Sequence, residues 1–157
     1  MKKKSFIFLL LLYLIWMFVI FYFSSQPAEE STETSLMVGT AIGQVVVPGF
    51  SELPSSKQRE YAESIEFPVR KAAHATEFAG LGVLYTGVMI CLQRKRYWQL
   101  GWLFGTIYAA TDEFHQLFVP GRSGQMQDVM LDGVGCLLGC LIVGILYDRH
   151  KEKTTDK

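Results

Sequence analysis

The chain has 157 residues, the length of a single domain, and its 15 basic and 15 acidic residues cancel. Nucleic-acid binding requires an excess of basic charge, so we expect no nucleic-acid partner. Half of the residues are hydrophobic and 13% are aromatic, a composition that is high for a soluble domain and ordinary for a membrane protein.

The first predicted element is an uncharged run over residues 5–23, SFIFLLLLYLIWMFVIFYF. As a helix this run would be roughly 28 Å long, close to the thickness of the hydrocarbon core of a bilayer. A cleaved signal peptide is the alternative, because Lys2, Lys3 and Lys4 would form its basic start. The run exceeds the usual apolar region of a signal peptide and a poor cleavage site follows it, which favours a retained membrane helix.

A polar loop over residues 24–71 follows, and we expect it to contain short surface helices. The apolar run over residues 36–50 contains Gly39 and Gly43 and ends at a Pro-Gly pair, so it is too short and glycine-rich for a span. We interpret it as a helix on the membrane surface or against the bundle. Residues 55–65 are polar and favour helix, which predicts a short helix outside the membrane.

Three further spans are predicted over residues 72–92, 97–118 and 128–147, followed by a polar, mobile tail over residues 148–157. With the N-terminus inside, four spans return the C-terminus to the same side and place the tightest basic clusters there, as the positive-inside tendency requires. The basic residues on this inner side are Lys2, Lys3, Lys4, Arg94, Lys95, Arg96, Arg149, Lys151, Lys153 and Lys157. The sequence thus predicts an all-α, multi-pass membrane bundle of about four helices forming a single domain, with a cytoplasmic tail and both termini cytoplasmic.

Small residues predict close helix packing within this bundle. Two predicted spans contain glycine pairs with a spacing of four, Gly101 with Gly105 and Gly135 with Gly139. Cys136 and Cys140 have the same spacing, which would suit a metal ion geometrically. Their segment offers no third soft ligand, so we interpret both cysteines as packing residues.

Ionisable side chains gather at the outer ends of three predicted spans. These residues are Arg70, Lys71, His74 and Glu77, then Asp112, Glu113, His115 and Gln116, and finally Arg122, Asp128 and Asp132. Spacings of four and three put Arg70, His74 and Glu77 on one helical face. A charged group costs about 2.5–3.5 kcal/mol at the bilayer centre, and less near the interface. A shared polar pocket between the helices would lower that cost, although structural pairing alone is the competing interpretation.

The charges of this group do not balance. Five carboxylates face three cations, and the deficit disappears if both histidines are protonated, if two carboxylates hold protons, or if a divalent cation binds. His115 could ligate such a cation together with His74, Glu77 or Asp132. No strict metal-binding motif is present, so the sequence leaves the metal unknown.

The residue types suggest separate chemical roles. His115 beside Asp112 and Glu113 is a candidate general base oriented by a carboxylate, so these three are the candidate catalytic residues. Arg122 lies in a glycine-containing turn, and its planar guanidinium suits a phosphate or a carboxylate. Asp128 has an alternative role as a helix N-cap, and Lys71 as a surface lysine. The candidate ligand-binding residues are Arg70, His74, Glu77, Gln116, Arg122, Asp128 and Asp132.

The segments RKAAHATEFAGLG and TDEFHQLFVPGRSGQMQDVMLDGVGCLLG, together with FYFSSQP, resemble the VanZ-like family. These are small bacterial membrane proteins named for a teicoplanin-resistance factor, and the resemblance extends over nearly the whole chain. Its most specific part is DExHQxFxPGR, here residues 112–122. The resemblance implies a polytopic protein of the bacterial cell membrane, linked in some members to reduced sensitivity to glycopeptide antibiotics. It supplies no established reaction, so the motif residues transfer only as functional positions.

The combined expectation is an envelope protein with an outward-facing polar pocket. The pocket would bind a membrane lipid of the envelope, a lipid-linked cell-wall precursor or a glycopeptide-type antibiotic. The alternative is a membrane enzyme acting on a lipid-linked, phosphate-bearing envelope precursor at the outer leaflet. A proton-coupled carrier is disfavoured, because the inner halves of the spans are apolar and offer no polar path. The sequence leaves catalysis and the oligomeric state open.

Overall fold

The computed structural model describes residues 2–94 and 96–155, and in this part every regular element is helical. The elements are α1 (Lys2–Ser24), α2 (Ala28–Val46), the 3₁₀ turn η1 (Phe50–Glu52), α3 (Ser55–Ser64), α4 (Glu66–Cys91), α5 (Tyr97–Gln116) and α6 (Met126–Thr155). The all-α prediction is therefore confirmed. Lys95 and Lys157, which the sequence assigned to the inner side, lie outside the described residues.

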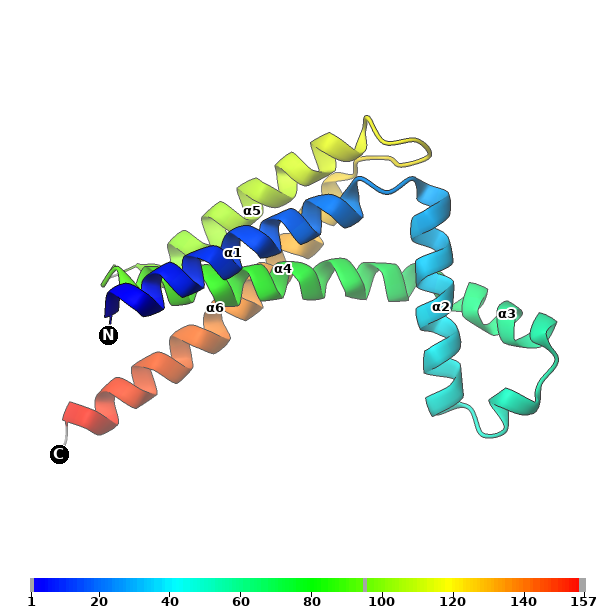
Figure 1. Ribbon diagram of the computed structural model, residues 1–157, viewed down its shortest axis with the longest axis horizontal. Coiled ribbons are helices and arrows are strands. Elements are labelled where there is room, and N and C mark those ends of the chain that lie inside the picture. Colours follow the sequence, from blue (N-terminus) through cyan, green and yellow to red (C-terminus); the bar gives the residue numbers. More distant parts are fainter. Residues whose placement is uncertain (1, 95, 156–157) are drawn as a thin grey trace.

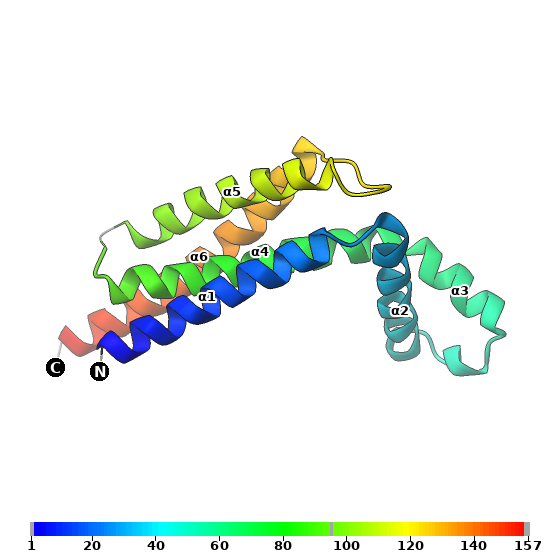
Figure 2. The same ribbon diagram turned by 45° about the horizontal axis from the view of Figure 1, so that its top comes forward.

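Four long helices form an elongated bundle, and two shorter helices project from one end of it (Figure 1). Helix α4 is central, because it contacts α1, α5 and α6 along the bundle. Helices α2 and α3 pack on each other and on α4, beyond the end where α1 finishes (Figure 2). The start of α1 and the end of α6 lie at the opposite end of the bundle (Figure 1).

The projecting helices correspond to the predicted surface helices, with one shift in position. Helix α2 begins at Ala28, eight residues before the predicted run, because Pro27 precedes it and Glu29 and Glu30 suit the positive end of a helix. The chain leaves this helix before Pro48, and Phe50 packs instead in the 3₁₀ turn with 1% of its surface exposed. Helix α3 ends one residue before the predicted limit.

Two other boundaries also differ from the predicted ones. Helix α4 begins at Glu66, six residues before the predicted span, so Arg70 and Lys71 lie within the helix. The polar tail predicted over residues 148–157 continues α6 as a helix up to Thr155 in its described part. No glycine or proline follows Gly144, and lysine, arginine and glutamate all favour helix, so nothing in this segment ends it.

Large apolar side chains cover the outside of the bundle, and several polar side chains lie inside it beside an apolar core that includes Ile20, Phe78 and Leu81. On α1, α5 and α6 respectively, Phe18 is 66% exposed, Phe114 62% and Ile142 56%, whereas Asp132 is fully buried. A soluble bundle has the reverse pattern. Two helices are long and apolar enough to cross a membrane, α1 over Lys3–Ser24 and α6 over Met126–Lys153. The described part therefore offers two candidate spans, where the sequence predicted about four.

Glycines set the spacing between the central helices, as predicted. A side chain on Gly139 would meet the backbone carbonyl of Ala79 on α4, and one on Gly135 would meet the carbonyl of Ala75. Helix α5 presents Gly101 and Gly105 to two thiols of α6. Cys136 and Cys140 are fully buried there as free cysteines, which agrees with a packing role.

This packing makes Gly139→Ala an informative substitution. The new methyl group would collide with backbone atoms that no side-chain rotation can move, so we expect a loss of about 1–3 kcal/mol in unfolding free energy. Gly144→Ala on the same helix is the matched control, because its methyl group would lie 3.4 Å from the Tyr97 ring, an ordinary contact. Unfolding in mixed detergent micelles measures both variants. Equal stability of the two would contradict close backbone packing at Gly139.

Candidate functional site

The predicted site residues converge at the end of the bundle from which α2 and α3 project. The end of α1, the start of α4, the end of α5 and the start of α6 all meet there. A cavity of about 220 Å³ lies among them, lined by Arg70, Lys71, His74, Gln116, Arg122 and Asp128. A neighbouring cavity of about 160 Å³ shares Arg70, His74 and Arg122 and adds Glu77.

A buried hydrogen-bond network joins α1 to α5 beside these cavities. The Ser24 hydroxyl donates to Asp112 Oδ2 at 2.8 Å, and the Gln116 amide donates to both Ser24 Oγ at 2.9 Å and Asp112 Oδ2 at 3.1 Å. All three side chains are at most 4% exposed. Asp112 and Gln116 meet because they are four residues apart on α5. Ser24 was not among the predicted site residues, although the motif FYFSSQP contains it.

Glu113 faces the start of α6 rather than the Asp112 network. Its Oε2 atom accepts the backbone N–H of Gln125 at 2.8 Å, just before Met126 begins α6. A carboxylate is favourable at this position, because the first N–H groups of a helix have no partner within the helix. The other oxygen, Oε1, is buried and has no hydrogen-bond partner.

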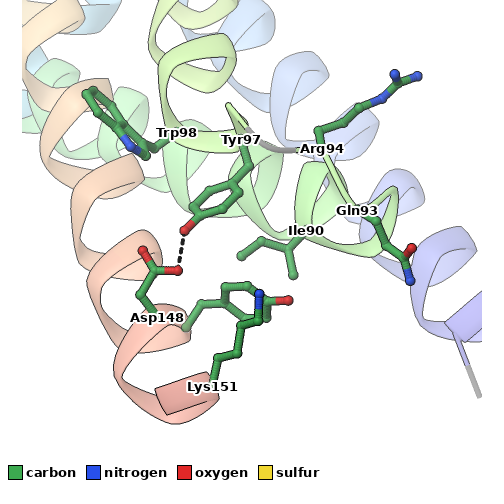
Figure 3. A pocket seen from close by; sticks show the side chains of 8 residues that line it. Ile90, Gln93, Arg94, Tyr97, Trp98, Asp148 and Lys151 are labelled. Carbon is green, nitrogen blue, oxygen red and sulfur yellow. Dashed lines mark hydrogen bonds between the residues drawn. The ribbon is translucent and has the colours of Figure 1, made fainter. Parts of the chain in front are cut away.

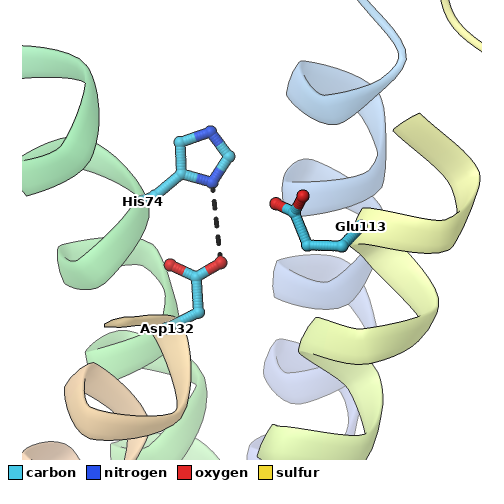
Figure 4. Close-up of side chains that lie close together, drawn as sticks. All are labelled: His74, Glu113 and Asp132. Atoms are coloured by element: carbon cyan, nitrogen blue, oxygen red, sulfur yellow. Dashed lines mark ion pairs between the residues drawn. The ribbon is translucent and has the colours of Figure 1, made fainter. Parts of the chain in front are cut away.

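Three side chains from three helices, each with an atom that could bind a metal ion, face one another beside the cavity (Figure 4). His74 of α4, Glu113 of α5 and Asp132 of α6 each bring one donor atom within 4.8 Å of the other two. His74 Nδ1 lies 3.7 Å from Asp132 Oδ2, an ion-pair distance that is too long for a hydrogen bond. Both oxygens of Asp132 are buried without a hydrogen-bond partner. Such an arrangement could hold a cation or exchange a proton.

His115 is placed differently from the arrangement that the sequence predicts. Its Nε2 atom lies 3.1 Å from the Ser25 hydroxyl of α1, and its ring lies 4.7 Å from the Phe21 ring, so neither Asp112 nor Glu113 orients it. The side chain projects from α5 toward α1 rather than toward the three facing donors. Among the described histidines, His74 is the one that faces carboxylates and also lines the cavities.

Arg122 is held in place by the end of α1 rather than free in its turn. Its guanidinium donates to the carbonyls of Gln26 at 3.1 Å and Phe23 at 3.3 Å. Phe23 belongs to the last turn of α1, and Gln26 follows that turn. Gly121 supplies the left-handed backbone of the turn, with φ at +73°. Burial lowers the pKa of Arg122, and the charge of Arg70 adds to this effect. The partly dehydrated guanidinium lines both cavities and can attract an anion there.

The other two cations of the site have acidic partners. Arg70 pairs with Glu66 on α4, and Lys71 pairs with Asp128 across to α6. The Lys71 ammonium also lies 5.3 Å from the centre of the Phe67 ring. Asp128 is therefore an interhelical ion-pair partner in the first turn of α6 rather than a cap in front of it.

These pairings change the charge balance at the centre of the site. The carboxylates without a lysine or arginine partner are Glu77, Asp112, Glu113 and Asp132. The charge of Arg122 interacts with three of them, Glu77, Asp112 and Glu113. The predicted excess of negative charge therefore lies on these four carboxylates of α4, α5 and α6 rather than being spread over the cavity.

An apolar groove, which the sequence analysis missed, opens beside the smaller cavity. It has a volume of about 630 Å³, lies between α2 and α4, and is lined by apolar side chains that include Val38, Ile42 and Val69. Thr34, Ser35, Ala73 and Glu77 line both the groove and the smaller polar cavity. A ligand with a charged head and an apolar chain could therefore occupy both.

A further cavity of about 640 Å³ lies at the opposite end of the bundle, between the α4–α5 turn and α6 (Figure 3). Tyr97 donates to Asp148 across it at 2.6 Å, and Arg94 and Lys151 line its rim. It contains none of the predicted site residues. The most specific part of the family resemblance, residues 112–122, lies at the other end.

The fold and site define a class of helical protein with an apolar exterior and a buried acidic centre. Comparison with known families agrees: the model of the VanZ/LLP1 family matches residues 8–147, and the chain belongs to this family. The resemblance predicted from the motifs is thereby confirmed. No curated protein and no solved structure matches the chain. Family membership together with two apolar helices indicates a membrane protein.

Proposed function

We propose that this protein binds a lipid-linked, phosphate-bearing molecule of the bacterial cell envelope in an outward-facing polar pocket. The observation that carries the proposal is the junction between the Arg122-lined cavity and the apolar groove of α2 and α4, which share four lining residues. A phosphate would contact Arg122 and Arg70, and the apolar chain would lie in the groove. Holding a cell-wall precursor in this way would reduce a glycopeptide antibiotic's access to it, consistent with the teicoplanin resistance for which the family is named.

The proposal includes four membrane crossings, with α4 and α5 between the two apolar helices. Helix α5 has 20 residues and α4 has 26, so each is at least about 30 Å long and can cross the hydrocarbon core. Trp102, Leu103 and Ile107 are more than 40% exposed on α5, which suits contact with lipid tails. Four crossings put both termini in the cytoplasm and the pocket outside.

Binding of a short-chain polyprenyl phosphate to the full-length protein in nanodiscs tests this proposal. We expect the phosphate ester to bind at least about tenfold more tightly than the corresponding polyprenol, a difference of about 1.4 kcal/mol. The variant Ile42→Gln should weaken both ligands, because it places an amide in the groove. Equal affinity for the ester and the alcohol, or no binding of either, would refute the assignment.

A membrane enzyme acting on the same class of molecule is the second candidate. His74 and Asp132 favour it, because an imidazole near a buried carboxylate at a cavity wall can transfer a proton. Release of phosphate from a polyprenyl diphosphate measures this activity. An enzyme should lose nearly all turnover in His74→Gln, whereas a binding protein shows no turnover even as the wild type.

A further inference from the structure

We propose that His74, Glu113 and Asp132 form a divalent metal site that joins α4, α5 and α6 at the polar end of the bundle. Their donor atoms lie within 4.8 Å of one another, and they come from three different helices that the fold brings together (Figure 4). Two ligands bound at about 2.1 Å from one ion are separated by at most about 4.2 Å. Small rotations at the side-chain ends would therefore complete the site.

Buried metal-ligand atoms that have no hydrogen-bond partner are the independent evidence for a cation. Asp132 is fully buried, and neither of its oxygens accepts a hydrogen bond. Glu113 Oε1 and His74 Nδ1 are also buried without hydrogen-bond partners. Buried polar atoms normally have hydrogen-bond partners. Several unpartnered ligand atoms close together therefore indicate a cation that would bind all of them.

The neighbouring contacts suit an ion better than a set of mutual hydrogen bonds. Glu113 Oε2 accepts the Gln125 N–H, which orients the carboxylate, while Oε1 is left buried without a hydrogen-bond partner. Metal ligands are commonly oriented by such second contacts. The only ion pair within the set, between His74 and Asp132, is 3.7 Å long and leaves Glu113 without a cation.

The donor set indicates the kind of metal. One imidazole nitrogen and two carboxylates suit Mn²⁺ or Zn²⁺, whereas an all-oxygen set would suit Mg²⁺ or Ca²⁺ better. Three protein ligands leave at least one coordination position open. His74 also lines both polar cavities, so the open position would adjoin the space where the phosphate is proposed to bind. This last step rests on the proposed function, and the metal site itself does not.

Metal titration of the full-length protein, stripped with a chelator and kept in detergent, tests the site directly. We expect one Mn²⁺ per chain, detected by electron paramagnetic resonance and displaced by Zn²⁺. Asp132→Asn and Glu113→Gln should each weaken Mn²⁺ binding at least about tenfold. Asp148→Asn is the matched control, because it makes the same change on the same helix at the opposite end, and it should bind as the wild type does.

The metal site would be overturned if the wild type binds neither Mn²⁺ nor Zn²⁺, or if Asp132→Asn and Glu113→Gln both bind metal as the wild type does. If Asp132→Asn does not fold, Glu113→Gln and His74→Gln give the same comparison on other helices. A second titration with polyprenyl phosphate, in chelator and in Mn²⁺, separates the two proposals. Metal binding without lipid binding would retain the site and reject the proposed function. Lipid binding without metal binding would retain the proposed function and reject the metal site.

Discussion

Replacing Arg122 by alanine is expected to weaken polyprenyl phosphate binding at least about tenfold, or about 1.4 kcal/mol. Arg122 lines both polar cavities, whereas Lys71 and Arg70 already have carboxylate partners. Its guanidinium is also partly dehydrated, which strengthens its attraction for an anion. In cells, the same variant should lose any resistance to teicoplanin that the wild type confers, measured as the minimum inhibitory concentration.

Two further variants separate recognition from folding. Arg122→Lys keeps the charge but loses the planar donor pair, so its affinity should lie between those of the wild type and Arg122→Ala. Arg59→Ala removes an exposed arginine of α3 that pairs with Glu33 and Glu63, and its affinity should equal that of the wild type. If Arg122→Ala and Arg59→Ala bind equally well, Arg122 does not contact the phosphate.

Substitution of Asp112 by leucine is expected to lower the free energy of unfolding by about 3 kcal/mol. Asp112 Oδ2 accepts hydrogen bonds from both Ser24 and Gln116 in a buried network. Leucine would remove the acceptor and leave those two donors without it, and each buried group left unsatisfied costs about 1–3 kcal/mol. Unfolding in mixed detergent micelles measures the effect, and α1 should separate from α5 first.

The neighbouring residue and a conservative change provide the controls. Thr111→Leu makes a similar change on the exposed side of α5 and should cost much less. Asp112→Asn keeps a carbonyl oxygen that can accept from Ser24, so its stability should lie between those of the two leucine variants. Equal stability of Asp112→Leu and Thr111→Leu would show that the network does not hold α1 to α5.

The sequence predicted the existence of the long helices and the convergence of the site because both depend on position along the chain. Uninterrupted apolar runs produce helices, and residues at the ends of neighbouring spans lie at similar depth whatever their detailed packing. His74, Glu113 and Asp132 were therefore found as members of one group. The glycine spacings of α5 and α6 also predicted close packing, because small residues four apart form a continuous face.

Other features depend on how each helix is rotated, which residue spacing does not determine. Successive residues of a helix differ by about 100° in direction, so Asp112, Glu113 and His115 face different neighbours. His115 contacts Ser25 as a result, although its predicted partners Glu113 and Asp112 are only two and three residues away in the sequence. The groove between α2 and α4 was missed because residue spacing does not show how a surface helix packs against a neighbouring span.

Cysteine labelling in intact cells tests most directly whether the polar end of the bundle faces outward. In a cysteine-free background, Ser123→Cys places a thiol at the polar cavity of about 220 Å³, and Glu152→Cys places one near the opposite end of α6. We predict that a membrane-impermeant maleimide labels Ser123→Cys in intact cells and labels Glu152→Cys only after lysis. Labelling of Glu152→Cys alone in intact cells would put the pocket in the cytoplasm and contradict the account.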